Sequence, residues 1–215
     1  MHPHPQYPNF FCADHPLILH KLTQMREAGL VSYSFRTLLR EISMLIGYEI
    51  TRSLELTTRP IRTPLSDMSA PTLAGRTPCV VPVLRAGLTM ADGLLDLMPM
   101  AQIGHIGVYR DHDTKKPVEY LVRLPPNKGQ VFFVADPMLA TGYSLVHACD
   151  VLIRYGVAPE KISVMALVAA PEGLKTFFAD HPKIRVYCAA LDERLDENAY
   201  IVPGLGDAGD RMFGT

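Results

Sequence analysis

The sequence lacks the long apolar run that a membrane-spanning helix requires. No stretch of about 18 consecutive apolar residues occurs, and the start, Met1-His2-Pro3-His4-Pro5, has neither the charged nor the apolar region of a signal peptide. The net charge is only −1 over 215 residues, which argues against a general binder of nucleic acid or of membrane surfaces. We therefore expect a cytoplasmic protein with no nucleic-acid partner and no membrane partner.

Common catalytic and metal-binding signatures are also missing. The eight histidines show no H-E-x-x-H spacing, and neither G-x-S-x-G nor G-x-x-x-x-G-K-[ST] occurs, which disfavours hydrolases and P-loop kinases. The cysteines lack metal-type spacing and lie mostly in apolar segments, so we expect buried free thiols. They are Cys12, Cys79, Cys149 and Cys188. No metal is expected to be held by protein side chains alone.

Apolar residues are plentiful, at 48% of the chain, and short apolar runs alternate with amphipathic segments. The runs predict strands at 79–84, 103–109, 131–135, 163–170 and 184–191. Helices are predicted at 16–28, 34–50 with Ser34 as its cap, 88–97 and 145–155, and through Leu174 to Phe178. This alternation predicts an α/β fold with a central, mostly parallel sheet flanked by helices on both faces.

Four segments do not fit this alternation. Residues 1–14 are expected to form an irregular arm, and 57–78, with four prolines between 60 and 78, to form extended edge structure and turns. Residues 111–117 are charged without an apolar period, which suits a mobile excursion or a hairpin tip. The tail from Tyr200 is glycine-rich and is expected to be irregular.

The stretch from Val131 to Ser144 carries the clearest indication of function. A buried strand ends in Asp136, Pro137 is expected to end its ladder, and a small polar turn from Thr141 leads into a helix. Ligands of open α/β sheets bind beyond the carboxyl ends of the strands, and a helix N-terminus attracts anions. Asp136 alone could be a turn residue, but the acid and two hydroxyls in one loop favour a site for a hydroxylated phosphate compound.

Two arginines occupy similar positions at strand ends. Arg85 precedes Ala86 and Gly87, whose small size would let an anion approach the backbone, and Arg110 ends the next strand. A lone arginine is often only a surface charge, but the planar guanidinium suits phosphate oxygens. We therefore expect both arginines to converge on one polyanion.

Residues 204–209 formally match G-x-G-x-x-G, but a dinucleotide fingerprint needs a following βαβ unit that this chain does not have. The glycines are better explained by close backbone approach to a ligand, such as a flat heterocycle bound through main-chain groups.

The stretch from Val134 to Ser144 resembles the phosphoribosyl-pyrophosphate (PRPP) loop of the type I phosphoribosyltransferases, in the variant of their uracil branch. Residues 81–88, 168–173 and 200–210 resemble the same branch, and the match extends back to about His15. The resemblance implies the type I phosphoribosyltransferase fold as a single domain over residues 1–215. It also implies an N-terminal helical region and a small C-terminal base-binding hood, with 1–14 as an arm and 192–215 as a uracil-binding tail.

The resemblance also implies roles for individual residues. Asp136 would hold the ribose hydroxyls of PRPP, Arg85 and the Ala86 backbone the pyrophosphate, and Arg110 would close from the next loop. Asp207 would act between base and ribose, through a Mg²⁺-bound water, which makes Asp207 and Arg85 the catalytic pair. The rest of the PRPP loop comprises Pro137, Met138, Leu139, Ala140, Thr141, Gly142, Tyr143 and Ser144. The implied uracil-binding residues are Ile201, Gly206, Asp207 and Ala208.

The implied reaction transfers the phosphoribosyl group of PRPP to N1 of uracil, giving UMP and pyrophosphate in pyrimidine salvage. Mg²⁺ chelated by PRPP is the implied cofactor, GTP a possible effector, and a homodimer or homotetramer the implied assembly. The segment 111–124 would close over the site and exclude water. Two alternatives are the same reaction on another base and a non-catalytic nucleotide- or RNA-binding regulator, although regulators tend to have a basic face.

One position departs from the pattern of this branch. Tyr143 stands where glycine is most common, and a positive φ there would cost tyrosine about 1–2 kcal/mol. We expect its ring to point away from the phosphate and PRPP binding to be retained, because backbone N–H groups need no particular side chain.

Overall fold

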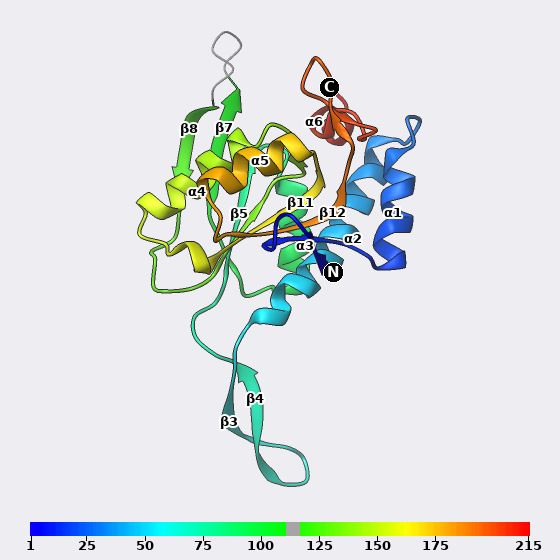
Figure 1. The fold of residues 1–215 in the computed structure, drawn as a ribbon. Helices are drawn as coiled ribbons and strands as arrows, with labels where there is room; N and C mark the ends of the chain where they lie inside the picture. The colour runs from blue at the N-terminus through cyan, green and yellow to red at the C-terminus, as the bar shows by residue number, and fades with distance from the viewer. Residues whose placement is uncertain (111–116) are drawn as a thin grey trace.

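The fold is built on one twisted, mostly parallel sheet (Figure 1). The computed structural model describes residues 1–110 and 117–215 and, of Arg110 and Pro117, only the backbone. The strands of the central sheet run in the order β1, β2, β12, β11, β9, β5, β7, β8, with β10 beside β11 and β6 beside β5. Their bounds are β1 His2–Pro3, β2 Phe10–Cys12, β5 Cys79–Leu84, β6 Gln102–Ile103, β7 His105–Arg110, β8 Pro117–Arg123, β9 Phe132–Ala135, β10 Met138–Leu139, β11 Ile162–Ala169 and β12 Arg185–Leu191.

The inner strands are buried on both faces, which explains their continuous apolar sequences. From β2 through β12, β11, β9 and β5 to β7, each neighbouring pair is parallel, and only β1–β2 and β7–β8 are antiparallel. Along β9, Phe132 and Val134 belong to the core on one face of the sheet, and Phe133 and Ala135 to the core on the other. The predicted parallel sheet is therefore confirmed.

Helices cover both faces, as the sequence predicted. One core contains buried residues of α1, α2, α3 and α6, and the other contains those of α4 and α5. The bounds are α1 Pro16–Arg26, α2 Ser32–Ile50, α3 Leu88–Leu97, α4 Tyr143–Arg154, α5 Pro171–Asp180 and α6 Ala208–Phe213, with short 3-10 turns at Thr51–Ser53 and Pro159–Lys161. Among the described residues no helix is long and apolar enough to cross a membrane.

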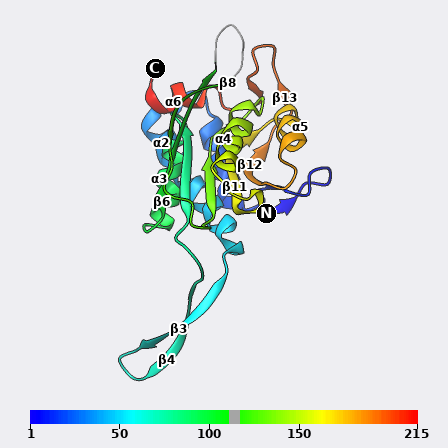
Figure 2. The same ribbon diagram turned by 90° about the vertical axis from the view of Figure 1, so that its left-hand side faces the viewer.

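Residues 57–78 are extended with turns, as predicted, but they do not form an edge of the central sheet. Strands β3 (Leu56–Arg62) and β4 (Asp67–Leu73) pair with each other and form a hairpin that projects from the body, on the side opposite α6 (Figures 1 and 2). Pro60 pairs with Ser69 and Pro71 with Thr58 inside this ribbon. Each strand of a two-stranded ribbon has an unpaired side, where the missing N–H of proline breaks no ladder bond.

Three further expectations need correction. Residues 10–12 of the expected irregular arm form β2, which pairs with β12. Ser34 is not a cap, because α2 already begins at Ser32 after Val31. The tail is not irregular throughout, since β13 (Arg194–Leu195) pairs with β14 (Ile201–Val202) and α6 follows.

The expected excursion at 111–117 lies almost wholly outside the described residues. It connects β7 to the antiparallel β8, and β8 occupies 117–123, the latter part of the segment expected to close over the site. All four cysteines are free, and Cys79, Cys149 and Cys188 are buried, as predicted.

Candidate active site

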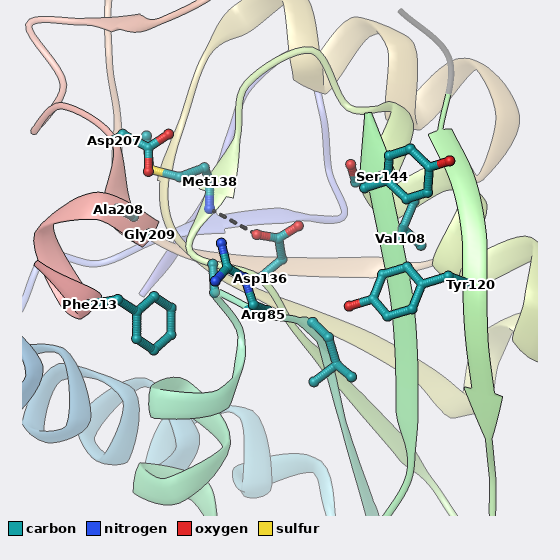
Figure 3. Close-up of a pocket in the computed structure, with 13 residues that line it drawn as sticks. Arg85, Val108, Tyr120, Asp136, Met138, Ser144, Asp207, Ala208, Gly209 and Phe213 are labelled. Atoms are coloured by element: carbon teal, nitrogen blue, oxygen red, sulfur yellow. Dashed lines mark hydrogen bonds between the residues drawn. The ribbon is translucent and has the colours of Figure 1, made fainter. Parts of the chain in front are cut away.

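A cavity of about 560 Å³ lies where β5 and β9 end and the C-terminal helix α6 begins (Figure 3). Because the central strands are parallel, their carboxyl ends meet at this edge of the sheet. Its lining combines an arginine, two carboxylates and aromatic rings from widely separated segments. The lining residues are Leu84, Arg85, Ala86, Val108, Tyr109, Tyr120, Asp136, Met138, Ser144, Asp207, Ala208, Gly209 and Phe213.

Asp136 follows β9 directly and projects into the cavity while remaining only 8% exposed. Burial raises the pKa of its carboxyl group from 3.8 to about 7, and the backbone N–H of Met138, which donates to Oδ1 at 3.3 Å, opposes that shift only in part. A buried carboxylate with open oxygen lone pairs is suited to accept hydrogen bonds from hydroxyl groups of a ligand.

The β9 ladder ends at Ala135, before Pro137, as the sequence predicted, but the interruption is short. The carbonyl of Pro137 accepts hydrogen bonds from the N–H groups of Leu167 and Val168, and the chain pairs again with β11 as β10. The carbonyl of Leu139 accepts from the N–H of Ala170 at 3.0 Å. The first half of the predicted phosphate loop is thereby braced against the central sheet.

The left-handed position of the loop is Gly142, not Tyr143. Gly142 has φ +89° and immediately precedes α4, whose first residue is Tyr143. A Cβ at Gly142 would lie 2.8 Å from the carbonyl oxygen of Gly173. Tyr143 is exposed and has helical backbone geometry, so tyrosine carries no left-handed strain at this position.

Arg85 directly follows β5 and lines the cavity. The N–H of Gly87 donates to the carbonyl of Val83 at 2.9 Å, which folds the chain into a turn before α3 begins. This turn leaves the Arg85 side chain exposed beside the cavity, where its Cζ lies 5.6 Å from the ring centre of Phe213.

Asp207 is the N-cap of α6. Its Oδ1 accepts a hydrogen bond from the backbone N–H of Asp210 at 2.9 Å, and the side chain is exposed to the cavity. Because only one oxygen is engaged in this cap, the second remains available to a ligand. The short helix therefore fixes the position of the carboxylate without consuming it.

The structure brings together seven of the predicted residues along this cavity: Arg85, Ala86, Asp136, Met138, Ser144, Asp207 and Ala208. Among the described residues, the other predicted positions do not line it: Pro137, Leu139, Ala140, Thr141, Gly142, Tyr143, Ile201 and Gly206. Pro137, Leu139 and Ile201 are buried. The side chain of Arg110 lies outside the described part, so its predicted role is unaffected by this geometry.

Sequence reasoning missed the aromatic wall of the cavity. Tyr109 and Tyr120 come from β7 and β8, and the hydroxyl of Tyr120 points into the cavity toward Arg85 and Asp136 (Figure 3). The available signal in the sequence was that each tyrosine is next to a charged residue in a strand beside the 111–117 segment. Phe213 had none, because α6 itself was not predicted.

In the described part of the chain, no group of three or more histidine, cysteine, aspartate or glutamate residues is arranged to hold a metal ion. The cavity does present the carboxylates of Asp136 and Asp207. Oxygen donors of this kind suit Mg²⁺, which is usually held by one or two carboxylates together with substrate phosphates and water.

Comparison with known proteins identifies the family. The family model for uracil phosphoribosyltransferase matches residues 12–215. The chain is 61% identical over 215 residues to the uracil phosphoribosyltransferase of Rhodospirillum centenum, covering 100% of both chains. It is 60% identical over 210 residues to that of Paraburkholderia phymatum, covering 98% of this chain and 97% of the relative.

Solved structures agree with the fold. The AQ2163 protein of Aquifex aeolicus superposes with a TM-score of 0.90 at 32% identity, over 96% of this chain and 98% of that one. The APRTase of Giardia lamblia shares the fold at a TM-score of 0.50 and 16% identity, over 73% of this chain and 80% of that one. With a family match that spans both sides of the cavity and relatives aligned from end to end, this chain belongs to the uracil phosphoribosyltransferase family.

Proposed function

We infer that the chain transfers the phosphoribosyl group of PRPP to N1 of uracil, producing UMP and pyrophosphate for pyrimidine salvage. The observation that carries this proposal is the shared cavity, in which Arg85, Asp136 and Asp207 approach one space from three distant segments. Together they offer a cation for pyrophosphate, a buried acid for ribose hydroxyls, and a carboxylate within the tail that the resemblance assigns to the base.

The binding roles combine the resemblance with the residues that line the cavity. Asp136 accepts hydrogen bonds from the two ribose hydroxyls, and the N-terminal turn of α4, with Ser144 at the cavity, receives the 5′-phosphate. Arg85 and the Ala86 backbone bind the pyrophosphate, and Arg110 adds a second cation. Thr141 supplies a hydroxyl beside the phosphate. Ile201, Gly206 and Ala208 bind uracil mainly through main-chain groups.

For the reaction at the ribose, the protein mainly has to position the reactants and stabilise the charge that develops. Uracil N1 attacks C1 on the face opposite the departing pyrophosphate, so the N1–C1 bond forms as the C1–O bond breaks and the N1 proton is lost to solvent. The centre is inverted through an oxocarbenium-like transition state. Arg85 stabilises the negative charge that grows on the leaving group, and Asp207 holds the base and ribose in line for the attack. The aromatic side chains of Tyr109 and Tyr120 limit the access of water, which would otherwise hydrolyse PRPP.

Mg²⁺ fits this arrangement as a companion of PRPP. When bound, it neutralises part of the pyrophosphate charge. Asp207 is suited to reach it through a water molecule, because only one of its oxygens is engaged in the α6 cap and the other is available. Asp136 is suited to the ribose instead, since it is buried and its Oδ1 is held by the Met138 amide.

Pyrophosphate release from PRPP and Mg²⁺ tests the proposal, with uracil, cytosine, hypoxanthine or no base as the second substrate. Of these bases, we expect only uracil to support pyrophosphate release. Release with hypoxanthine only would replace uracil by a purine as the substrate. A chain that binds PRPP but releases no pyrophosphate with any base would instead be a regulator on the same fold.

Assembly and control are part of the same proposal. A homodimer or homotetramer would cover apolar side chains that the projecting hairpin exposes, among them Leu56, Leu65 and Leu73. Sedimentation of the purified chain checks this, and a monomer at micromolar concentration would contradict it. GTP as an effector is checked by titrating it into the uracil assay at subsaturating PRPP. A cytoplasmic location is checked by fractionation.

A further inference from the structure

The C-terminal end of α1 and the tail are joined by arginine side chains that donate hydrogen bonds in both directions. Arg26, the last residue of α1, donates from Nη1 to the carbonyl of Gly204 at 2.6 Å. In the other direction, Arg211 of α6 donates to the carbonyls of Met25 and Glu27 at 2.6 and 2.5 Å. Each arginine therefore binds backbone carbonyls of the opposite segment, and Arg211 satisfies acceptors that the end of a helix leaves without partners.

A buried carboxylate completes this contact. Asp192 follows β12, and its two oxygens accept from Nη1 and Nη2 of Arg26 at 2.8 and 2.6 Å. Oδ2 also accepts from the N–H of Gly204 at 3.0 Å. The side chain of Asp192 is 4% exposed and that of Arg26 is 25% exposed. Fork-to-fork pairs of this kind fix orientation as well as distance.

These contacts hold both polar groups of one glycine backbone. The N–H of Gly204 binds Asp192, and its C=O binds Arg26. Gly204 has φ +57°, and a Cβ there would lie 2.0 Å from the carbonyl oxygen of Ile201, so the chain turns tightly at this point. Arg211 also donates to the carbonyl of Leu205 at 2.9 Å. The backbone is thus immobilised directly before Gly206.

The fixed segment leads straight into the cavity. Asp207, Ala208 and Gly209 line it, and they follow Leu205 with only Gly206 between. Recognition of a flat base through main-chain groups requires those groups to be aligned before the base arrives, because a mobile loop would lose conformational entropy on binding. Three residues from three segments, Arg26, Asp192 and Arg211, provide that alignment here without lining the cavity themselves.

We propose that Arg26, Asp192 and Arg211 are positioning residues for the uracil subsite, and that α1 is its foundation. This proposal rests on the proposed function, since it assigns the base to the loop after Gly204. It gives the N-terminal helix a part in substrate selection, through the backbone of the tail.

The test compares the Michaelis constants of the two substrates. In Asp192→Asn, which keeps the shape of the side chain, we expect KM for uracil to rise roughly tenfold as a charged pair is lost, with KM for PRPP changed less than twofold. Arg26→Lys keeps the charge but not the bidentate fork, and we expect the same direction. Lys21→Met is the matched control, because Lys21 also lies on α1 and pairs with Glu41 on α2 at 2.6 Å.

Hydrogen exchange at residues 204–208 provides a readout that does not depend on turnover. We expect faster exchange there in both variants than in Lys21→Met, without uracil or PRPP present. Equal rises in both Michaelis constants, the same change in Lys21→Met, or unchanged exchange would each overturn the proposal. Failure of the unaltered chain to release pyrophosphate with uracil would instead count against the proposed function. The exchange measurement would still test whether Arg26, Asp192 and Arg211 hold the backbone of the tail.

Discussion

The guanidinium of Arg85 lies over the ring of Phe213, with Cζ 5.6 Å from the ring centre. The two residues line the same cavity but come from distant parts of the sequence, one directly after β5 and the other from the last turn of α6. The negative face of an aromatic ring attracts a cation in this position. Arg85 is therefore supported by the same short helix whose cap is Asp207.

Phe213→Leu tests this support, because leucine keeps the apolar bulk and removes the ring. An exposed cation–π contact contributes about 0.5–1 kcal/mol, so we expect KM for PRPP to rise roughly two- to fivefold. Phe213→Tyr keeps the ring and should retain the original constant. In an Arg85→Ala background, Phe213→Leu should have no further effect on PRPP binding measured by calorimetry. An undiminished effect there would mean that Phe213 acts by another route.

The free chain should gain stability when Asp136 can no longer ionise. Its folded-state pKa of about 7 exceeds the ordinary value of 3.8, so its stabilising contribution is complete below pH 4 and is lost as pH rises through 7. Asp136→Asn escapes this loss. We expect its Tm to exceed that of the unaltered chain by roughly 5 °C at pH 8 and the gap to narrow toward pH 5. Scanning calorimetry without PRPP measures this, and a gap that widens at pH 5 would contradict it.

PRPP should show the opposite pH dependence. The ionised form of Asp136 accepts both ribose hydroxyls, so kcat/KM for PRPP should rise with pH through about 7, where the free carboxyl titrates. The phosphates of PRPP titrate in a similar range, and the profile of Asp136→Asn serves as the control because it retains only their contribution. Superimposable profiles would remove the Asp136 carboxyl from PRPP binding.

Gly142 and Tyr143 should respond in opposite ways to substitution. Gly142→Ala places a Cβ at φ +89° and 2.8 Å from the Gly173 carbonyl oxygen, so we expect the free energy of unfolding to fall by about 1–3 kcal/mol and PRPP binding to weaken. Tyr143→Gly should leave PRPP binding within twofold and cost about 1 kcal/mol or less of helix stability. Chemical denaturation and PRPP titration measure both. Sharply tighter PRPP binding in Tyr143→Gly would contradict the helical assignment of Tyr143.

Asp207→Asn should separate the structural role of this residue from its chemical role. Asparagine is as good an N-cap as aspartate, so α6 and the melting temperature should be preserved. Turnover should fall roughly 100-fold or more, because a charge aimed at the reacting centre is lost. Steady-state kinetics with uracil and PRPP measure this. An unchanged kcat would exclude Asp207 from the mechanism.

The sequence was informative where the pattern is local. The apolar run at 131–135 predicted a buried strand, and its end located Asp136 at the ligand edge of the sheet. The strand at 79–84 and the helix at 88–97 have the predicted bounds. Such patterns follow directly from burial on one or both faces of an element.

Contacts between residues that are far apart in the sequence produce no such local pattern. Arg26 and Asp192 are 166 positions apart and form a bidentate pair, and Phe213 meets Arg85 only after α6 folds. The glycine content of the tail hid α6, whose stability comes from packing of Ala208 and Met212 in the core and not from helix propensity. The proline-rich hairpin was missed because its prolines sit on the unpaired sides of a ribbon.

The pairing of β2 with β12 has a consequence for the order of assembly. Phe10 to Cys12 align in parallel with Val186 to Cys188, and the Val186 N–H donates to the Asn9 carbonyl at 2.8 Å. A contact between residues so far apart closes a long loop, so it forms after the local βα units have collapsed. Phe10 is fully buried there. The edge of the sheet formed by β1 and β2 is therefore expected to be the last part to gain protection from hydrogen exchange during refolding. It is also expected to be the first to open under denaturant.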